Sequence, residues 1–226
     1  MFKKVITFNY NFGVIPSPDI HFQSDALKDK TTIELCLKLI REEVAELAVA
    51  INKNDFVEMI DALADILYVV YGMCCRIGYT PEDKDALTTN GCVNSNIITD
   101  NAELVHYYLG RIQADLHTLE KSTDISNTIS ALESMISYVF AMTAVTGVIL
   151  EDAFELVHSN NMSKMCSTEA DAKKSVHHYQ KPGSIYTTPS YRKTPGGMYI
   201  IYNQETLKIL KSITWVPVDL RSVCGL

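Results

Sequence analysis

The sequence predicts an all-α protein, a helical bundle with a small β-hairpin near its C-terminal end. Apolar residues recur with the helical period along several stretches between residues 31 and 160. Short polar breaks separate these stretches, so successive helices are expected to pack as antiparallel pairs. From Pro182 onward glycine, proline, threonine and tyrosine become frequent, and two apolar runs there flank a polar turn, which is typical of a hairpin.

Length and composition bound the class of protein. A chain of 226 residues can form one domain with an appended piece. We expect a helical domain over residues 1–165, with a loop insertion at 79–101, and a C-terminal extension over 166–226 that carries the hairpin. The chain has no uninterrupted run of 18 apolar residues, and its N-terminal stretch is polar. Both features predict that the protein has no membrane partner. The net charge of -7 argues against a nucleic-acid surface.

The cysteines indicate the compartment. The six cysteines show no paired metal spacing, and three of them lie inside helical patterns, as reduced buried thiols do. Reduced thiols are typical of the cytoplasm, which is the predicted location.

The first helical pair begins near residue 31. Thr31-x-x-Glu34 reads as a capping box that opens a helix, and the apolar period continues until the break at 52–54. Asp55-x-x-Glu58 then caps a second helix that runs to about Arg76. Residues 1–30, which contain Gly13, Pro16 and Pro18, are expected to form an irregular arm.

The remaining elements follow in order. Helices are expected at 103–121, 125–147, 151–160 and 168–175, and hairpin strands at 198–202 and 207–215. The second helical pair echoes the first at an offset of 70, for example Tyr68 against Tyr138 and Val69 against Val139. This echo fits either a degenerate internal repeat or chance agreement between helix-forming sequences.

Two rows of carboxylates lie on the first helical pair. On a helical wheel Glu42, Glu43 and Glu46 fall within an arc of about 100° beside the apolar stripe. On the second helix three more fall within about 60° of one another, and the same face continues as apolar residues one turn later. A face that is acidic and then apolar is expected to point inward. The three acids are Glu58, Asp61 and Asp65.

Carboxylates that converge between packed helices repel one another and lose hydration. Divalent cations relieve both costs, and ligation by oxygen atoms alone favours Mg²⁺ or Mn²⁺ over zinc. The alternative is that these acids are solvated faces of surface helices. The wheel positions and the absence of interleaved lysines argue against it.

These residues resemble the all-α NTP pyrophosphohydrolases, the MazG-like and phosphoribosyl-ATP pyrophosphohydrolase-like superfamily. The resemblance spans roughly residues 5–165 and lies in four motifs. They are Phe8-Asn9-x-x-Phe12-Gly13, Glu42-Glu43-x-x-Glu46, the helix from Asp61 to Tyr68, and Glu155-x-x-His158-x-x-Asn161-Met162-Ser163-Lys164. The stretch from Ser175 onward is similar to extensions of a viral or phage-like subset.

One position departs from the family. Its second motif is usually Glu-x-x-Asp, and matching that Asp to Asp65 places Ala62 where the Glu belongs. Glu58-x-x-Asp61 fits the motif literally, one turn earlier. We favour Asp61 and Asp65, with Glu58 in support, because Asp65 is followed by Ile-Leu-Tyr as in relatives.

The resemblance implies Mg²⁺-dependent hydrolysis of the α,β-phosphoanhydride of a nucleoside triphosphate (NTP or dNTP), giving the monophosphate and pyrophosphate. Glu43, Glu46, Asp61 and Asp65 would hold the metal ions, and Glu42 would orient or deprotonate a water molecule. The motif that follows the last helix would bind the substrate phosphates, with Lys164 as a point charge and Asn161 as a hydrogen-bond partner.

Alternatives remain within and outside this chemistry. They are phosphoribosyl-ATP hydrolysis, an inactive nucleotide-binding relative, and a di-iron bundle, since Glu155-x-x-His158 is an element such sites use. A di-iron site needs a second such element, which the sequence lacks. The family usually forms dimers, so a homodimer is expected. If the second helical pair replaces a partner subunit, the protein is a monomer.

Overall fold

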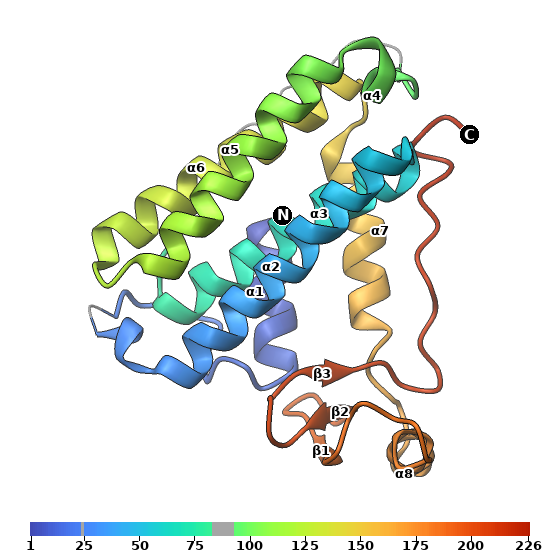
Figure 1. The fold of residues 1–226 in the computed structure, drawn as a ribbon. Helices are drawn as coiled ribbons and strands as arrows, with labels where there is room; N and C mark the ends of the chain where they lie inside the picture. The colour runs from blue at the N-terminus through green and yellow to red at the C-terminus, as the bar shows by residue number, and fades with distance from the viewer. Residues whose placement is uncertain (24, 83–92) are drawn as a thin grey trace.

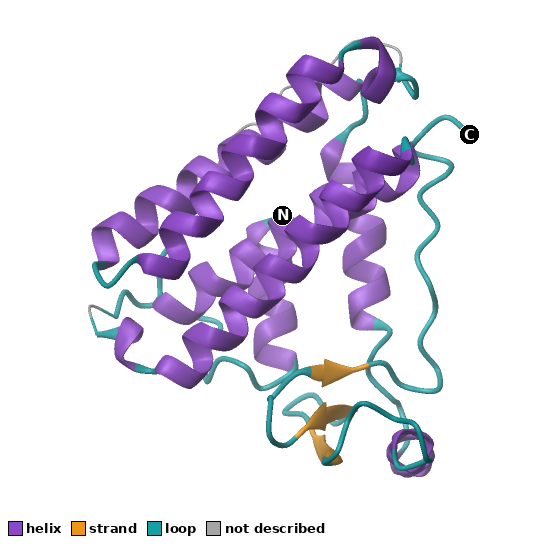
Figure 2. Ribbon diagram, viewed as in Figure 1, coloured by secondary structure: helices purple, strands orange, loops and turns teal. Residues whose placement is uncertain are grey.

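The computed structural model describes residues 1–23, 25–82 and 93–226, and it confirms the all-α class (Figures 1 and 2). The described residues form α-helices joined to one small antiparallel sheet. The helices are α1 (Phe2–Asn11), α2 (Lys30–Lys53), α3 (Phe56–Ile77), α4 (Ile97–Asp100), α5 (Ala102–Lys121), α6 (Ile125–Thr146), α7 (Leu150–Met162) and α8 (Glu169–Tyr179). The strands are β1 (Pro189–Lys193), β2 (Tyr199–Asn203) and β3 (Ile209–Leu210).

Two antiparallel helical pairs build the bundle, as the short polar breaks predict. α2 pairs with α3, and α5 pairs with α6; α2 also packs on α5, and α3 on α6 (Figure 1). α1 and α7 pack on α3 as well, so α3 lies at the centre and is buried around most of its circumference. One hydrophobic core connects these helices.

The ends of the first pair follow from local chemistry. The Asp55 side chain accepts a hydrogen bond from the Glu58 N–H at 3.2 Å and caps α3 as predicted. The predicted capping box at Thr31 is wrong, because α2 begins one residue before it. Asp29 caps α2 instead, and its side chain accepts a hydrogen bond from the Thr32 N–H at 3.2 Å. A carboxylate at the N-cap can reach the free N–H three residues later.

Replacing Asp55 by Ala will destabilise the bundle without touching the cavity described below. Loss of the cap leaves a free N–H at the start of the central helix and costs about 1 kcal/mol. The expected fall in Tm is about 2–4 °C for a chain of this size, measured by circular dichroism. Asp55→Asn, which keeps a capping oxygen, is the control, and an equal fall for both variants would contradict the role of the cap.

The expectation of an irregular arm over residues 1–30 is wrong at its start, where α1 forms. Phe2, Val5 and Asn9 are the buried residues of this helix and recur at helical spacing on one face. Gly13, with φ of +62°, lies just beyond its end. The glycine and the prolines therefore follow the helix and do not prevent it.

The other boundaries shift modestly. α7 and α8 are longer than expected, and the short helix α4 lies within the predicted loop insertion. The part of that insertion at 83–92 lies outside the described residues. The two sequence segments that are similar at an offset of 70 have the same architecture, since each forms an antiparallel helical pair. Arg111 contacts Tyr138 with its Nε at 2.9 Å from the hydroxyl, whereas Arg41 contacts Glu120 at 2.8 Å.

The C-terminal extension carries a three-stranded sheet in the order β1-β2-β3. The predicted hairpin is confirmed as the β2–β3 pair, with Ile201 opposite Leu210. β1 was missed because its sequence, Pro-Ser-Tyr-Arg-Lys, is polar and lacks the alternation of a half-buried strand. Cys166, Ala172, Ile201 and Leu210 form a separate small core between α8 and the sheet.

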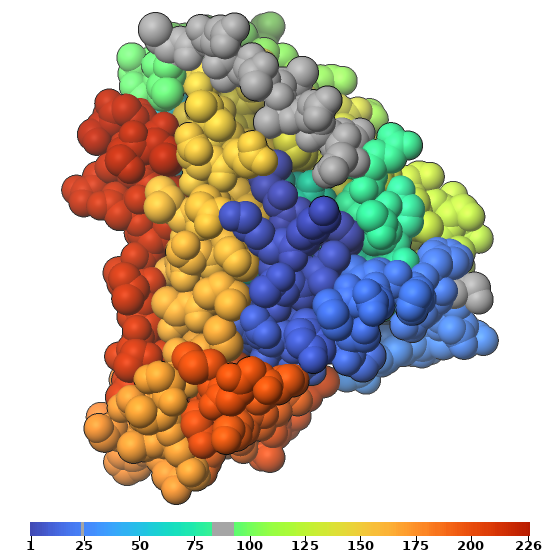
Figure 3. Space-filling model, turned by 180° about the vertical axis from the view of Figure 1, so that it is seen from behind, coloured from blue at the N-terminus to red at the C-terminus, as the bar shows by residue number. Residues whose placement is uncertain are grey.

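The extension attaches to the bundle at several places, through β1, near its C-terminal end and at the cavity described below. The Arg192 guanidinium Nη2 donates to the Phe12 and Gly13 carbonyl oxygens at 2.8 and 3.1 Å. Beyond β3 the chain runs along the side of α7, as the red segment in Figure 3 shows. There Leu220 and Cys224 enter the main core.

Two features bear on the expected compartment. By length and composition alone α6 could cross a membrane, but its apolar residues belong to the main core against α3 and α5. The described cysteines Cys36, Cys74, Cys75, Cys166 and Cys224 are free and buried. Cys92 lies outside the described residues.

Candidate functional site

A cavity of about 540 Å³ lies between the first helical pair, the C-terminal end of α7 and the extension. The row on α2 faces into it, as the wheel predicts, and so do Asp61 and Asp65 of the row on α3; the inward direction predicted for Glu58 is wrong. Among the described residues, the predicted site residues that line it are Glu42, Glu43 and Glu46 of α2, Asp61 and Asp65 of α3, and Asn161 and Lys164. Glu58 is exposed and is not among the described residues that line the cavity.

The cavity has an acidic end and an apolar end. Along α3 the lining residues Asp61, Asp65, Val69 and Gly72 follow one another at about one turn. Antiparallel α2 supplies acids beside Asp61 and Asp65, and then Leu39, Cys36 and Leu35 beside the apolar residues. The transition from acidic to apolar that the sequence predicts for α3 therefore runs along the cavity as far as Gly72, and Arg76 lines it one turn further on.

The carboxylates are short of positive charge. Burial and the neighbouring Asp65 and Glu46 raise the pKa of Glu43 to about 8. Burial and nearby carboxylates, first Asp65 and then Glu58, raise the pKa of Asp61 to about 7. Burial also raises the pKa of Asp65 to about 6, although Lys164 opposes that rise. At neutral pH Glu43 therefore mostly holds a proton and Asp61 is partly protonated, and a nearby cation would displace these protons.

These acids fit a hard divalent cation. Asp61 Oδ1 is buried and has no hydrogen-bond partner among the residues that the structure describes, and a buried unpaired carboxylate oxygen costs about 1–3 kcal/mol or more. The donors are all carboxylate oxygens, the ligands that Mg²⁺ and Mn²⁺ prefer. Within the described ranges, no three His, Cys, Asp or Glu residues are already grouped as a metal site.

The motif at the end of α7 reaches the acids as predicted. Lys164 Nζ donates to Asn161 Oδ1 at 2.5 Å, and Asn161 also hydrogen-bonds to the Asp65 carboxylate, which lowers the pKa of Asp65. Burial lowers the pKa of Lys164, while Asp65 and Glu43 act in the opposite direction. The ammonium group therefore lies beside the acids, bonded to Asn161 and attracted by the charges of Asp65 and Glu43.

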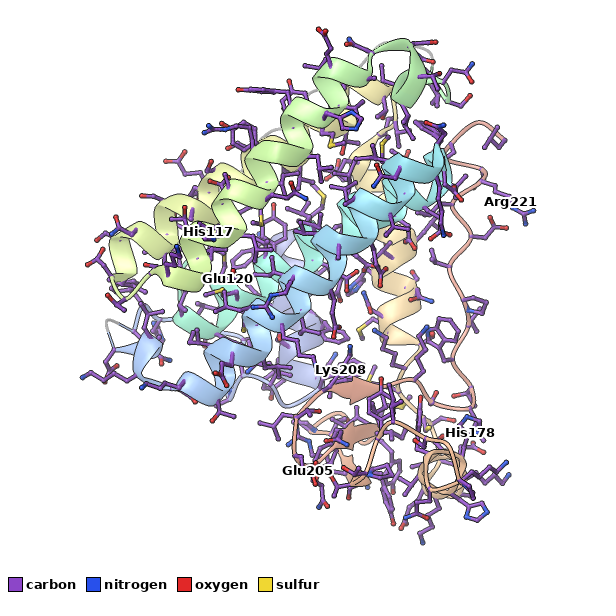
Figure 4. All side chains as sticks on the ribbon, viewed as in Figure 1. His117, Glu120, His178, Glu205, Lys208 and Arg221 are labelled. Carbon is purple, nitrogen blue, oxygen red and sulfur yellow. The ribbon has the colours of Figure 1, made fainter. Side chains whose placement is uncertain are left out.

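Glu42 has partners that sequence reasoning did not foresee. Its Oε2 accepts from Lys208 Nζ at 2.5 Å, and Lys38 Nζ lies 4.0 Å from its Oε1. Lys208, labelled in Figure 4, lies where the extension meets the helices. The ion pair with Lys208 fixes the orientation of the Glu42 carboxylate at the edge of the cavity.

The extension supplies a whole wall of the cavity. The sequence predicts a hairpin in the extension and assigns no site residue to it. The available signal was the pair of lysines that flank the short strand β3, Lys208 and Lys211. The extension residues that line the cavity are Tyr179, Tyr186, Leu207, Lys208, Ile209, Leu210, Lys211, Trp215, Pro217 and Val218.

Ala62, the departure from the family motif, is buried in the main core and 4 % exposed. Asp61, one residue earlier, is the α3 residue that lines the cavity at this level. The residues of the di-iron alternative point elsewhere: His158 Nδ1 lies 3.0 Å from the Tyr68 hydroxyl, and Glu155 pairs with Lys4. Tyr68, Tyr71, Cys74 and Cys75 are buried in the main core, and Tyr68 also lines the cavity.

Comparisons with known proteins indicate the family of the chain. Residues 14–84 match the family described as phosphoribosyl-ATP pyrophosphohydrolase, a stretch that holds both acidic rows. The chain is also 33 % identical over 227 residues to the uncharacterized protein L479 of Acanthamoeba polyphaga mimivirus, covering 93 % of this chain and 90 % of that protein. No solved structure matches. The chain therefore belongs to the phosphoribosyl-ATP pyrophosphohydrolase-like family of the MazG-like all-α superfamily, whose members are hydrolases of phosphoanhydrides.

Proposed function

We propose that the protein is a Mg²⁺-dependent nucleoside triphosphate pyrophosphohydrolase that cleaves the α,β-phosphoanhydride of an NTP or dNTP. The observation that carries this proposal is that five carboxylates from α2 and α3 and the Lys164 side chain line the same cavity. A triphosphate is a polyanion, and only a cavity that can also hold divalent cations would accept it beside so many acids.

Glu43, Glu46, Asp61 and Asp65 are the residues that would hold Mg²⁺, or Mn²⁺ in its place. Bound there, such ions would neutralise phosphate oxygens and lower the pKa of a water molecule. Asp61 takes the place of the family's Glu, since Ala62 lies in the core. Glu58, which is exposed, contributes only its charge: it is among the carboxylates that raise the pKa of Asp61.

Glu42 is the residue proposed to orient the attacking water and accept its proton. The water oxygen bonds to the α-phosphorus, the bond from that phosphorus to the bridging oxygen breaks, and pyrophosphate leaves. Lys164 places a positive charge beside the phosphates, and Asn161 fixes the ammonium group through its 2.5 Å hydrogen bond.

Phosphoribosyl-ATP is the second candidate substrate. The description of the matched family favours it, and the bond broken is of the same chemical type. A third candidate is a binding protein without turnover, which the loss of the family's Glu at Ala62 would favour. The presence of Asp61 on the cavity wall argues for retained activity.

Pyrophosphate release from a panel of NTPs, dNTPs and phosphoribosyl-ATP, with Mg²⁺ or with EDTA, tests the proposal. We expect turnover of one or a few nucleotides that depends on the metal. Turnover of phosphoribosyl-ATP alone would identify the second candidate. If folded protein releases pyrophosphate from none of them with either Mg²⁺ or Mn²⁺, the proposal fails and the binding function remains.

We also propose that the protein acts in the cytoplasm, consistent with its free, buried cysteines. Its assembly is a homodimer, as is usual in the family, or a monomer in which α5 and α6 replace a partner's helical pair against α2 and α3. Sedimentation velocity distinguishes these two assemblies.

A further inference from the structure

The wall of the cavity that the extension supplies has a chemistry of its own. It carries two lysines, Lys208 and Lys211, and one indole, that of Trp215. Both lysines lie at the acidic end. Lys208 contacts Glu42 directly, and Lys211 is close enough to Asp61 and Asp65 to oppose the rise in their pKa values.

Trp215 presents an unused donor at the same place. Its Nε1 is buried and, in the part of the chain that the structure describes, has no hydrogen-bond partner. Lys211 Nζ lies 3.7 Å from the centre of its ring, at cation–π distance. A buried indole N–H without an acceptor is unfavourable, and an acceptor atom of a ligand would remove that cost.

The segment around Trp215 is fixed to the end of α7. The Val216 N–H donates to Ser163 Oγ at 3.1 Å, and Asn160 Nδ2 donates to the Val216 carbonyl oxygen. These two anchors flank Asn161 and precede Lys164 in the sequence. The wall is thereby held beside Lys164, which donates a hydrogen bond to Asn161.

The two walls together specify the ligand. One wall offers carboxylates, which suit divalent cations, and the other offers ammonium groups and an indole N–H, which can only donate hydrogen bonds. A group with several negatively charged oxygens can accept from the second wall and meet cations held by the first. A chain of phosphates has this chemistry, whereas a base or a ribose does not.

We propose that Lys208, Lys211 and Trp215 form the binding site for the β- and γ-phosphates of the substrate, and so for the pyrophosphate that leaves. The proposal rests on the proposed function and adds the extension to the site. The nucleoside then lies toward the apolar end, beside Leu39 and Val69. When phosphate binds, Lys211 shifts part of its contact from the indole to phosphate oxygens.

Trp215 is also the probe, because it is the only tryptophan in the sequence. Tryptophan fluorescence of the intact protein is followed while inorganic pyrophosphate is added in the presence of Mg²⁺. We expect a saturable change with pyrophosphate and little change with nucleoside monophosphates, which lack the β- and γ-phosphates.

Lys211→Met should weaken pyrophosphate binding by about tenfold or more, since it removes a charged hydrogen bond. Trp215→Phe, which keeps a ring but lacks the N–H, should also weaken binding when measured by calorimetry. Lys181→Met is the matched control, because Lys181 is exposed in the same extension and does not line the cavity. Circular dichroism establishes that each variant is folded.

The outcomes separate this inference from the proposed function. If nucleotides are hydrolysed but folded Lys211→Met and Trp215→Phe bind pyrophosphate as the unmodified protein does, the inference is overturned and the function stands. If no nucleotide is hydrolysed but the fluorescence and the variants respond as expected, the phosphate site stands and the function fails. Absence of any pyrophosphate binding overturns the inference whether or not turnover occurs.

Discussion

Glu43→Gln and Asp65→Asn will each reduce pyrophosphate release by about 10²-fold or more without lowering the Tm of the metal-free protein. Both acids line the cavity, and both have raised pKa values because burial and neighbouring carboxylates disfavour their ionised forms. An amide of the same shape removes that repulsion, but it is a poor ligand for a divalent cation. A steady-state assay and a thermal melt of each variant test both parts.

Glu58→Gln is the matched control, since Glu58 is an acid of α3 that is exposed and does not line the cavity. It should change turnover by no more than about twofold, the usual range of a surface substitution. If instead Glu58→Gln is as inactive as Asp65→Asn, the pair Glu58 and Asp61 forms the metal site. Full activity in Glu43→Gln would contradict the assignment of the acidic rows.

The metal-free protein will lose stability as the pH rises from about 4 to about 8. Between the unfolded values of 3.8 to 4.5 and the folded values of about 7 for Asp61 and about 8 for Glu43, the folded state holds protons that the unfolded state has released. Stability falls with pH wherever the folded state binds more protons. The metal-free protein is thus most stable, as far as these two acids decide it, below pH 4, and that part of its stability is lost by about pH 8.

We expect Tm in EDTA to fall by about 5 °C or more across this window. Mg²⁺ should restore it, and most strongly at pH 8, where the acids are ionised; a ligand at 100 times its Kd adds about 2.7 kcal/mol. Asp61→Asn should flatten the pH dependence in EDTA. A Tm that rises from pH 5 to pH 8 without metal would contradict the raised pKa values.

Local signals were enough for much of the fold. The α2–α3 and α5–α6 pairs follow from the apolar period and from caps such as Asp55, which act over three or four residues. α1 was missed because its period covers only three buried residues beside glycine and proline, and β1 because its side chains are polar. In both elements, contacts with distant segments decide the structure.

The same distinction divides the candidate site. The acidic rows could be placed on one face because their spacing along each helix fixes their direction. The opposite wall could not be placed, since the contact between Lys208 and Glu42 joins residues 166 positions apart. No helical period or turn signal in the sequence specifies which part of an extension folds back over which acid.

The path of the extension also bears on how the protein matures during synthesis. The helices through α7 emerge from the ribosome first, whereas Lys208 and Trp215 are made later and Leu220 and Cys224 later still. A nascent chain halted after α7 would therefore display an open, acidic groove. The wall that carries Lys208 and Trp215, and the part of the main core that Leu220 and Cys224 supply, are added only when the following residues dock, so the cavity is completed last.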